Sequence, residues 1–198
     1  MKILSVGWFD KVSNTSLHRH NAIVENYLNV DAIDCATETT FGYRIANKLF
    51  NLGFPLNLPD KIGENEKILD FVKKNSYDLV WIDKGVTVKK STLIFIKRVN
   101  KNTKIVSFTA DNMALRHNQS QDYLDCFPFY DFHITTKSFI VDTLLGMKAK
   151  NVIFTNQTYQ ADFHYPRTLT VSEKKDFEAS VGFVGVWEKE RSDSIKYL

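Results

Sequence analysis

The chain has 198 residues, of which 43% are hydrophobic, 13% aromatic and 25% charged, and this composition excludes a disordered or fibrous protein. Its length allows one domain, or one domain and the beginning of another, and is too short for a two-lobed enzyme. Lys and Arg (26) exceed Asp and Glu (23) by only 3 charges, and the two signs are interspersed, which argues against a nucleic-acid-binding stripe.

Short runs of β-branched or aromatic residues alternate with stretches of helical spacing, as is typical of parallel βαβ units. The first strand is expected at residues 2–9, and its apolar run is too short for the core of a signal peptide or for a membrane span. A loop of N-cap residues at 13–16 and a helix at 17–28 follow. This order predicts an α/β fold with a Rossmann-like, doubly wound, mostly parallel sheet.

The same alternation continues to residue 156. Further strands are expected at residues 30–35, 78–84, 103–110, 131–136 and 151–156, and helices at 41–52, 62–74, 91–99 and 137–145. The unbroken apolar run at 79–82 is typical of a strand that is covered on both faces. Two prolines make 54–60 a loop, and Gly146 is expected to end the helix before it.

Beyond residue 156 the pattern changes. Residues 157–180 are irregular and charged, so we expect a linker or a surface excursion there. A fresh strand is expected at 180–186, followed by a helix from residue 190 that is interrupted where the chain ends. We therefore divide the chain into a Rossmann-like domain at 1–170 and, at 171–198, a linker with the first strand and the start of a helix of a second, truncated domain.

Two cysteines and the absence of several motifs exclude some kinds of site. Cys35 and Cys126 lie 91 positions apart, with no CxxC motif and no His at a metal-ligand spacing, so the sequence predicts no metal site and no disulfide framework. This usage fits a reducing compartment, and we expect a cytoplasmic location. The motifs GxSxG and HExxH are also absent, so nothing in the sequence supports a hydrolase.

Ligands of open parallel sheets bind beyond the carboxyl ends of the strands, which selects the candidate binding residues. They are Ser13, Asn14, Thr15, His18 and His20 after the first strand, and Lys84, Asp111, Asn112, Thr136 and Lys137 after later strands. Neither GxGxxG nor GxxxxGK[ST] occurs, which argues against a dinucleotide or P-loop site. The loop at 13–16 could hold an anion or a sugar hydroxyl at a helix N-terminus, or simply cap that helix.

Each of these side chains has a structural alternative. His18 and His20 point in directions about 200° apart on a helix, so at most one of them faces the crevice, either as a general base or as a hydrogen-bonded structural histidine. Asp111 with Asn112 could fix sugar hydroxyls, and a turn would use the same pair. Lys84 fits an anionic ligand or an ion pair with a neighbouring aspartate.

Seven segments in chain order resemble the CgeB-like (spore maturation protein-like) bacterial glycosyltransferases, a group with a GT-B fold. They are MKIL at the N-terminus, YDLVWIDKG (77–85), VSFTADN (106–112), YDFHITTK (130–137), LGMKAKNVIF (145–154), the group Tyr159, Asp162, His164 and Pro166, and VGFVGVWEKER (181–191). The resemblance covers nearly the whole chain. The family often has two acidic residues where this chain has Asp111 and Asn112, so a second carboxylate at that point is unsupported.

The resemblance implies a two-lobed enzyme of the hexosyltransferase type. Its N-terminal lobe holds a hydroxyl-bearing acceptor, which is a glycan, a protein or a small molecule, and its C-terminal lobe binds a nucleotide-sugar donor as co-substrate, without a further cofactor. His20 and Asp111 would then act in catalysis and the other candidates would bind substrate. The segment containing Gly185 and Arg191 opens the donor lobe, and the chain ends seven residues later, so we expect this part to be inactive alone.

Two other hypotheses remain open at this point. The chain could be a non-catalytic α/β binding or scaffold protein with a glycosyltransferase-like fold. A receiver domain like those of response regulators would need an acidic pair at the end of the first strand, and this strand is followed by Asp10 alone.

Overall fold

The computed structural model describes residues 1–10, 12, 14–183, 185 and 187–197. These residues fall into two compact units, Met1–Phe163 and His164–Leu198. The division lies within the stretch 157–180 that the sequence marks as irregular.

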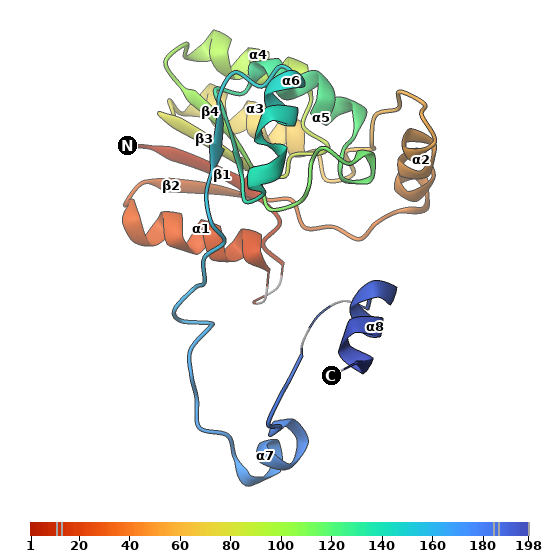
Figure 1. Cartoon of the computed structure of the whole chain (residues 1–198). Helices are drawn as coiled ribbons and strands as arrows, with labels where there is room; N and C mark the ends of the chain where they lie inside the picture. The colour runs from red at the N-terminus through yellow and green to blue at the C-terminus, as the bar shows by residue number, and fades with distance from the viewer. Residues whose placement is uncertain (11, 13, 184, 186, 198) are drawn as a thin grey trace. The chain divides into compact units, whose positions relative to one another are not determined.

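A six-stranded parallel sheet with the order β2-β1-β3-β4-β5-β6 forms the centre of the first unit (Figure 1). Its strands are β1 (Ile3–Gly7), β2 (Val30–Asp34), β3 (Leu79–Asp83), β4 (Lys104–Thr109), β5 (Phe132–Thr135) and β6 (Val152–Phe154). The chain starts in the middle of the sheet, moves out to β2, and then crosses back to β3 and continues to the other edge. This topology confirms the predicted α/β fold of the Rossmann-like, doubly wound type.

The crossovers between strands place helices on both faces of this sheet. They are α1 (Thr15–Asn26), α2 (Phe41–Asn51), α3 (Glu64–Lys74), α4 (Lys90–Val99), α5 (Gln121–Cys126) and α6 (Val141–Gly146), with short 3₁₀ turns η1 (Arg116–Asn118), η2 (Phe127–Phe129) and η3 (Ser138–Ile140). Because right-handed crossovers that run in opposite directions along a sheet lie on opposite faces, α1 is separated from α3 and α4 by the sheet (Figure 1).

The two sides of β3 are buried to different degrees. On the face toward α3 and α4, Val80 and Ile82 of β3 are fully buried in a core that includes Ile68 and Leu93. Burial of each such side chain contributes about 1.5–3 kcal/mol. On the face toward α1, Trp81 is only half-buried. The strand β3 is therefore less evenly covered than its unbroken apolar run predicts.

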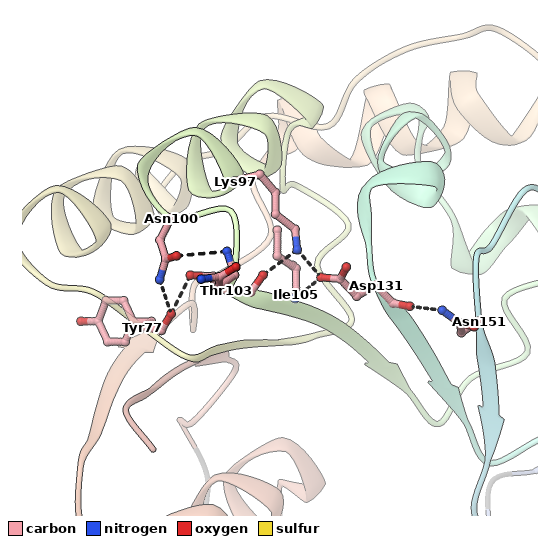
Figure 2. A network of polar contacts seen from close by, with 8 residues as sticks. Tyr77, Lys97, Asn100, Thr103, Ile105, Asp131 and Asn151 are labelled. Atoms are coloured by element: carbon pink, nitrogen blue, oxygen red, sulfur yellow. Dashed lines mark hydrogen bonds and ion pairs between the residues drawn. The ribbon is translucent and has the colours of Figure 1, made fainter.

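A polar network joins the amino ends of three neighbouring strands (Figure 2). The ammonium of Lys97 donates to the carboxylate of Asp131 at 2.6 Å and to the carbonyl of Thr103 at 2.5 Å. The same carboxylate accepts from the backbone N–H of Ile105 at 2.7 Å, and the backbone carbonyl of Asp131 accepts from Asn151 Nδ2 at 2.9 Å. This network ties the starts of β4, β5 and β6 to the end of α4.

The helix expected at 137–145 begins as the 3₁₀ turn η3 and ends as α6. It stops at Gly146 as expected, but the left-handed residue beyond it is Lys148, with φ 74°. The N–H of Ala149 donates to the carbonyl of Leu144 at 3.1 Å, which is the six-to-one hydrogen bond of a Schellman closure. The turn therefore falls two residues later than the glycine predicts.

The second unit holds two short helices, α7 (Val171–Phe177) and α8 (Lys189–Lys196). Thr170 and Glu173 form a reciprocal capping box at the start of α7, which explains a helix inside a stretch expected to be irregular. The strand expected at 180–186 is absent from its described residues, 180–183 and 185, while Val184 and Val186 lie outside the described residues. A strand needs a neighbour for its backbone hydrogen bonds, and the described part of this unit contains no other strand.

Among the described residues, none of the helices is both long enough and apolar enough to cross a membrane.

Candidate functional site

A cavity of about 340 Å³ lies beyond the carboxyl ends of β1, β3 and β4. This is the point where the strand order reverses, the usual ligand position of an open α/β sheet. Its described lining includes the hydroxyl groups of Thr15, Ser16, Thr37, Thr39, Thr40, Thr87 and Thr109, the aromatic rings of Trp8 and Tyr43, the carboxyl groups of Glu38, Asp60, Glu64, Asp83 and Asp111, and the basic groups of Arg19, Lys61 and Lys84.

Gly7 allows the first turn of α1 to approach the end of β1. A Cβ atom at this position would lie 2.5 Å from Ser16 Oγ, which is too short for a contact unless the serine side chain moves, and 3.1 Å from Asp83 Cβ, which is tight. The backbone N–H of Trp8 donates to Ser16 Oγ at 3.2 Å. Gly7, which is not part of a phosphate-binding motif, is therefore needed for packing at the floor of the cavity.

Arg19 and Asp83 form a bidentate ion pair at this floor. Arg19 Nε donates to Asp83 Oδ2 at 2.6 Å, and Arg19 Nη2 donates to Asp83 Oδ1 at 2.9 Å. The guanidinium also lies over the ring of Phe108, 4.2 Å from its centroid. Burial raises the pKa of the Asp83 carboxyl, and the guanidinium opposes part of this rise. The ion pair and the contact with Phe108 hold both side chains in place beside the cavity.

Lys84 and Gly85 follow β3 with left-handed backbone angles, φ 66° and φ 42°. A side chain at Gly85 would lie 2.6 Å from Ile82 Cγ2, so this second position requires glycine. The ammonium of Lys84 lies 2.6 Å from the carboxylate of Asp111, and both side chains are nearly half exposed. Of the two roles open to Lys84, the structure has the ion pair.

Glu64 lies at the start of α3 and is almost fully buried. Its carboxylate accepts a short hydrogen bond from the Thr87 hydroxyl. Burial raises the pKa of Glu64 above its ordinary value of 4.5, while the hydrogen bonds from Thr87 and Cys35 and the positive end of the helix oppose this rise. Burial, followed by the nearby Glu64 carboxyl, also raises the pKa of the Cys35 thiol, so that thiol is a poor nucleophile.

Asn65 joins the start of α3 to the loop after β3. Its Nδ2 donates to Asp60 Oδ2 and to the Thr87 carbonyl, each at 2.8 Å. Its Oδ1 accepts from the Lys89 N–H at 2.8 Å and from Thr92 Oγ1 at 2.7 Å. Because all four hydrogen-bonding positions of this amide are used, the cavity wall around Glu64 is held rigidly.

The structure brings four of the sequence-predicted residues to the cavity. Asn14 and Thr15 reach it from the start of α1, and Lys84 and Asp111 from the ends of β3 and β4. Asn14 also caps α1 by accepting from the Ser16 N–H at 2.9 Å, so its structural alternative is realised as well. Ser13 lies outside the described residues.

The two histidines of α1 do not line this cavity. His20 Nδ1 lies 3.0 Å from Ser5 Oγ, its ring stacks on Phe9, and burial lowers its pKa. His18 Nε2 lies 2.6 Å from the carbonyl oxygen of Val12. The general-base role of His20 stays a prediction. It requires that this side chain moves into the cavity, or that the acceptor reaches His20 from outside the cavity.

The remaining candidates make local contacts. Asn112 Oδ1 accepts from the Ala114 N–H at 3.1 Å, as in the turn named as its alternative. Thr136 Oγ1 donates to the Ala110 carbonyl at 3.3 Å, and Lys137 is half-buried beside it. In the second unit, Arg191 lies 3.1 Å from the carboxylate of Glu188, and Gly185 packs near the ring of Phe183. Donor binding by Gly185 and Arg191 stays a prediction.

Sequence reasoning missed Arg19, Glu64 and Tyr43. The rule of strand ends cannot find them, because they lie inside helices that approach the cavity from elsewhere in the fold. One signal was present for Arg19, since it follows the N-cap residue of α1 by five positions and therefore lies within its first turns.

A scan against protein-family models and a search of curated proteins both found no match to this sequence. Within the described residues, no three His, Cys, Asp or Glu side chains converge as a metal site would require.

Proposed function

We propose that this chain forms the acceptor-binding part of a glycosyltransferase that moves a sugar from a nucleotide-sugar donor to a hydroxyl group. Three features support the proposal: the Rossmann-like sheet, the cavity at its switch point, and the resemblance of seven segments to the CgeB-like enzymes. The chemistry of the cavity is the observation that carries it.

The cavity offers the groups that a sugar requires. Trp8 and Tyr43 supply flat apolar surfaces, and carboxylates such as those of Asp83 and Asp111 accept hydrogen bonds from hydroxyl groups. Threonine hydroxyl groups around the rim can both donate and accept. A polyol ring has the same combination of apolar faces and hydroxyl edges.

The charges of the cavity favour a neutral ligand over an anionic one. Its described lining has five acidic and three basic side chains. Two of the basic groups, Arg19 and Lys84, are already paired with Asp83 and Asp111. A nucleoside diphosphate would have to displace these carboxylates, so the proposal assigns this cavity to the acceptor and leaves the donor to another site.

Within this proposal Asp111 is the catalytic group, because its half-exposed carboxylate stands at the cavity rim where an acceptor hydroxyl can reach it. Glu64 and Asp83 at the floor would hold other hydroxyl groups of the acceptor. Lys84 would orient the carboxylate of Asp111 through their ion pair.

Saccharide binding tests the assignment of the cavity. Ligand-observed NMR with a panel of methyl glycosides and of nucleoside diphosphates should detect at least one neutral saccharide bound to the chain. Trp8→Ala should weaken that binding about tenfold, because it removes a stacking surface. Trp187→Ala, which changes another exposed tryptophan, should leave it unchanged. Tighter binding of a nucleoside diphosphate than of every saccharide would refute the assignment.

Transfer tests the reaction itself. The product of the whole gene should transfer labelled sugar from one member of a nucleotide-sugar panel, and Asp111→Ala should lower kcat by about 100-fold or more. His20→Ala examines the second predicted group in the same assay. Full activity in both variants would show that the catalytic assignment is wrong. Saccharide binding without transfer from any donor would instead favour the non-catalytic binding protein.

A further inference from the structure

The outward face of α2 carries three exposed apolar side chains, with Lys48 between them. At about 100° per residue, Phe41, Ile45 and Leu52 fall within about 40° of one another around the helix axis. Their side chains are 79%, 43% and 68% exposed. A surface helix ordinarily presents polar side chains on this face and buries its apolar ones.

The opposite face of α2 is firmly attached to the first unit. Phe50 is fully buried, and the guanidinium of Arg116 lies over its ring, 3.9 Å from the centroid. Arg116 Nε also donates to the Phe50 carbonyl at 2.5 Å. The start of α2 is capped locally, where Thr40 Oγ1 accepts from the Tyr43 N–H at 3.2 Å. The attachment fixes which face of α2 points outward, and Figure 1 shows α2 standing apart from α3 and α4.

The loop after α2 also exposes apolar side chains. Phe54 and Leu56 are 55% and 38% exposed, so five large apolar side chains lie exposed within sixteen consecutive residues. We name Phe41, Ile45, Leu52, Phe54 and Leu56 the α2 patch.

The charged residues of the segment 39–59, which contains the α2 patch, are all of one sign. Arg44 and Lys48 are both exposed, and Lys48 falls in the same line along the helix as Ile45 and Leu52. No acidic residue occurs between Glu38 and Asp60. Apolar side chains with interspersed Lys and Arg are the composition of helices that lie in the interface of an anionic bilayer.

We propose that the α2 patch binds the surface of a membrane that contains anionic lipids, with Phe41, Ile45 and Leu52 entering the acyl boundary and Arg44 and Lys48 contacting the headgroups. The inference goes beyond the proposed sugar transfer and does not depend on it. Thr39 and Tyr43 of the same segment line the cavity, and Tyr43 lies on the side of α2 opposite to the α2 patch.

A second copy of this chain is the other apolar partner to consider, and the charges disfavour it. A two-fold dimer through α2 would place Arg44 and Lys48 of one copy against the same residues of the other. Like charges that face each other across an interface weaken it, whereas an anionic headgroup layer neutralises them.

Co-sedimentation of the chain with lipid vesicles tests the proposal. The chain should bind vesicles of phosphatidylcholine with phosphatidylglycerol, bind pure phosphatidylcholine vesicles much more weakly, and be released by high salt. Phe41→Ser with Ile45→Ser should weaken binding by at least tenfold. Arg44→Gln with Lys48→Gln should weaken it by about 30-fold, since each basic residue near the surface contributes about fivefold.

The matched control changes the same residue types elsewhere on the surface. Phe139 and Ile94 are 72% and 38% exposed, close to the values of Phe41 and Ile45. Phe139→Ser with Ile94→Ser should bind like the unmodified chain, and circular dichroism shows that each variant keeps its fold. The proposal fails if the phosphatidylglycerol vesicles bind nothing, or if the α2 and control variants bind equally. It also fails if the unmodified chain does not bind vesicles but forms a dimer in the ultracentrifuge, and if Phe41→Ser with Ile45→Ser dissociates that dimer while the control variant does not.

Discussion

Charged side chains have opposite roles at the two ends of the strands of the sheet. At the amino ends of the strands, the Asp131 carboxylate accepts hydrogen bonds from Lys97 and from the Ile105 N–H (Figure 2). At the carboxyl ends of the strands, Glu64 is buried next to a cavity, and Lys84 has left-handed backbone angles. The first arrangement stabilises the fold, whereas the second carries local energetic costs of the kind that binding sites retain.

The pKa values of the two carboxyl groups follow this division. Burial disfavours ionisation of Asp131, but the Lys97 ammonium and the Ile105 N–H outweigh it and lower its pKa. At Glu64 burial dominates, and the pKa is raised. Ionised Asp131 therefore favours the folded state, and ionised Glu64 opposes it.

The largest effect is expected for Asp131→Asn. It leaves the half-buried Lys97 ammonium without its carboxylate and should lower the free energy of unfolding at neutral pH by about 2 kcal/mol, as measured by urea denaturation. Because the folded-state pKa of Asp131 is lowered, the difference from the unmodified chain should shrink as the pH falls through that pKa. Asp70→Asn, at the exposed pair with Lys73, should change stability by less than about 0.5 kcal/mol. Equal effects at both positions would contradict the structural role of the network.

A smaller effect of opposite sign is expected for Glu64→Gln. The folded-state pKa of Glu64 is raised, so the cost of ionising it appears as the pH rises through that value. The variant should therefore be more stable than the unmodified chain by about 1 kcal/mol above that pKa, and equally stable below the ordinary pKa of 4.5. Saccharide binding by the variant should fall in the NMR assay. A loss of stability at neutral pH would place Glu64 with Asp131 among the stabilising carboxylates.

The smallest effect concerns the backbone at Lys84. A left-handed conformation costs a residue with a Cβ atom about 1 kcal/mol, so Lys84→Gly should be more stable than Lys84→Ala by about that amount. At Lys67, an exposed position inside α3, the order should be reversed, with Ala more stable than Gly by about 1 kcal/mol. Thermal unfolding of the four variants compares the two sites. The same order at both would exclude backbone strain at the cavity.

Most of the fold could be predicted from local patterns. Each strand of the sheet lies within a predicted run, because alternation of apolar strands and amphipathic helices reports burial directly. The prediction of a strand at 180–186 was wrong for its described residues. β-Branched and aromatic residues favour a strand, but a strand forms only where a neighbouring strand pairs with it.

The site could be predicted where it consists of strand ends and of the loop that leads from β1 into α1. Lys84 and Asp111 follow strands directly, so the sheet topology alone brings them to the cavity. Arg19 and Glu64 depend on how closely α1 and α3 approach the sheet, which is decided by tertiary contacts such as that between Gly7 and Ser16. A prediction of the outward apolar face of α2 would likewise have needed the contact of Phe50 with Arg116.

The absence of a side chain at Gly7 also gives a way to recognise relatives of this protein. Ser16 and Arg19 follow that glycine by nine and twelve positions, and the motif Asp-Lys-Gly at 83–85 completes the floor of the cavity. Any sequence that keeps this floor has to keep the glycine, because a single methyl group would displace the serine hydroxyl. A spaced pattern of these six positions can therefore find proteins that share the cavity even where overall similarity has disappeared.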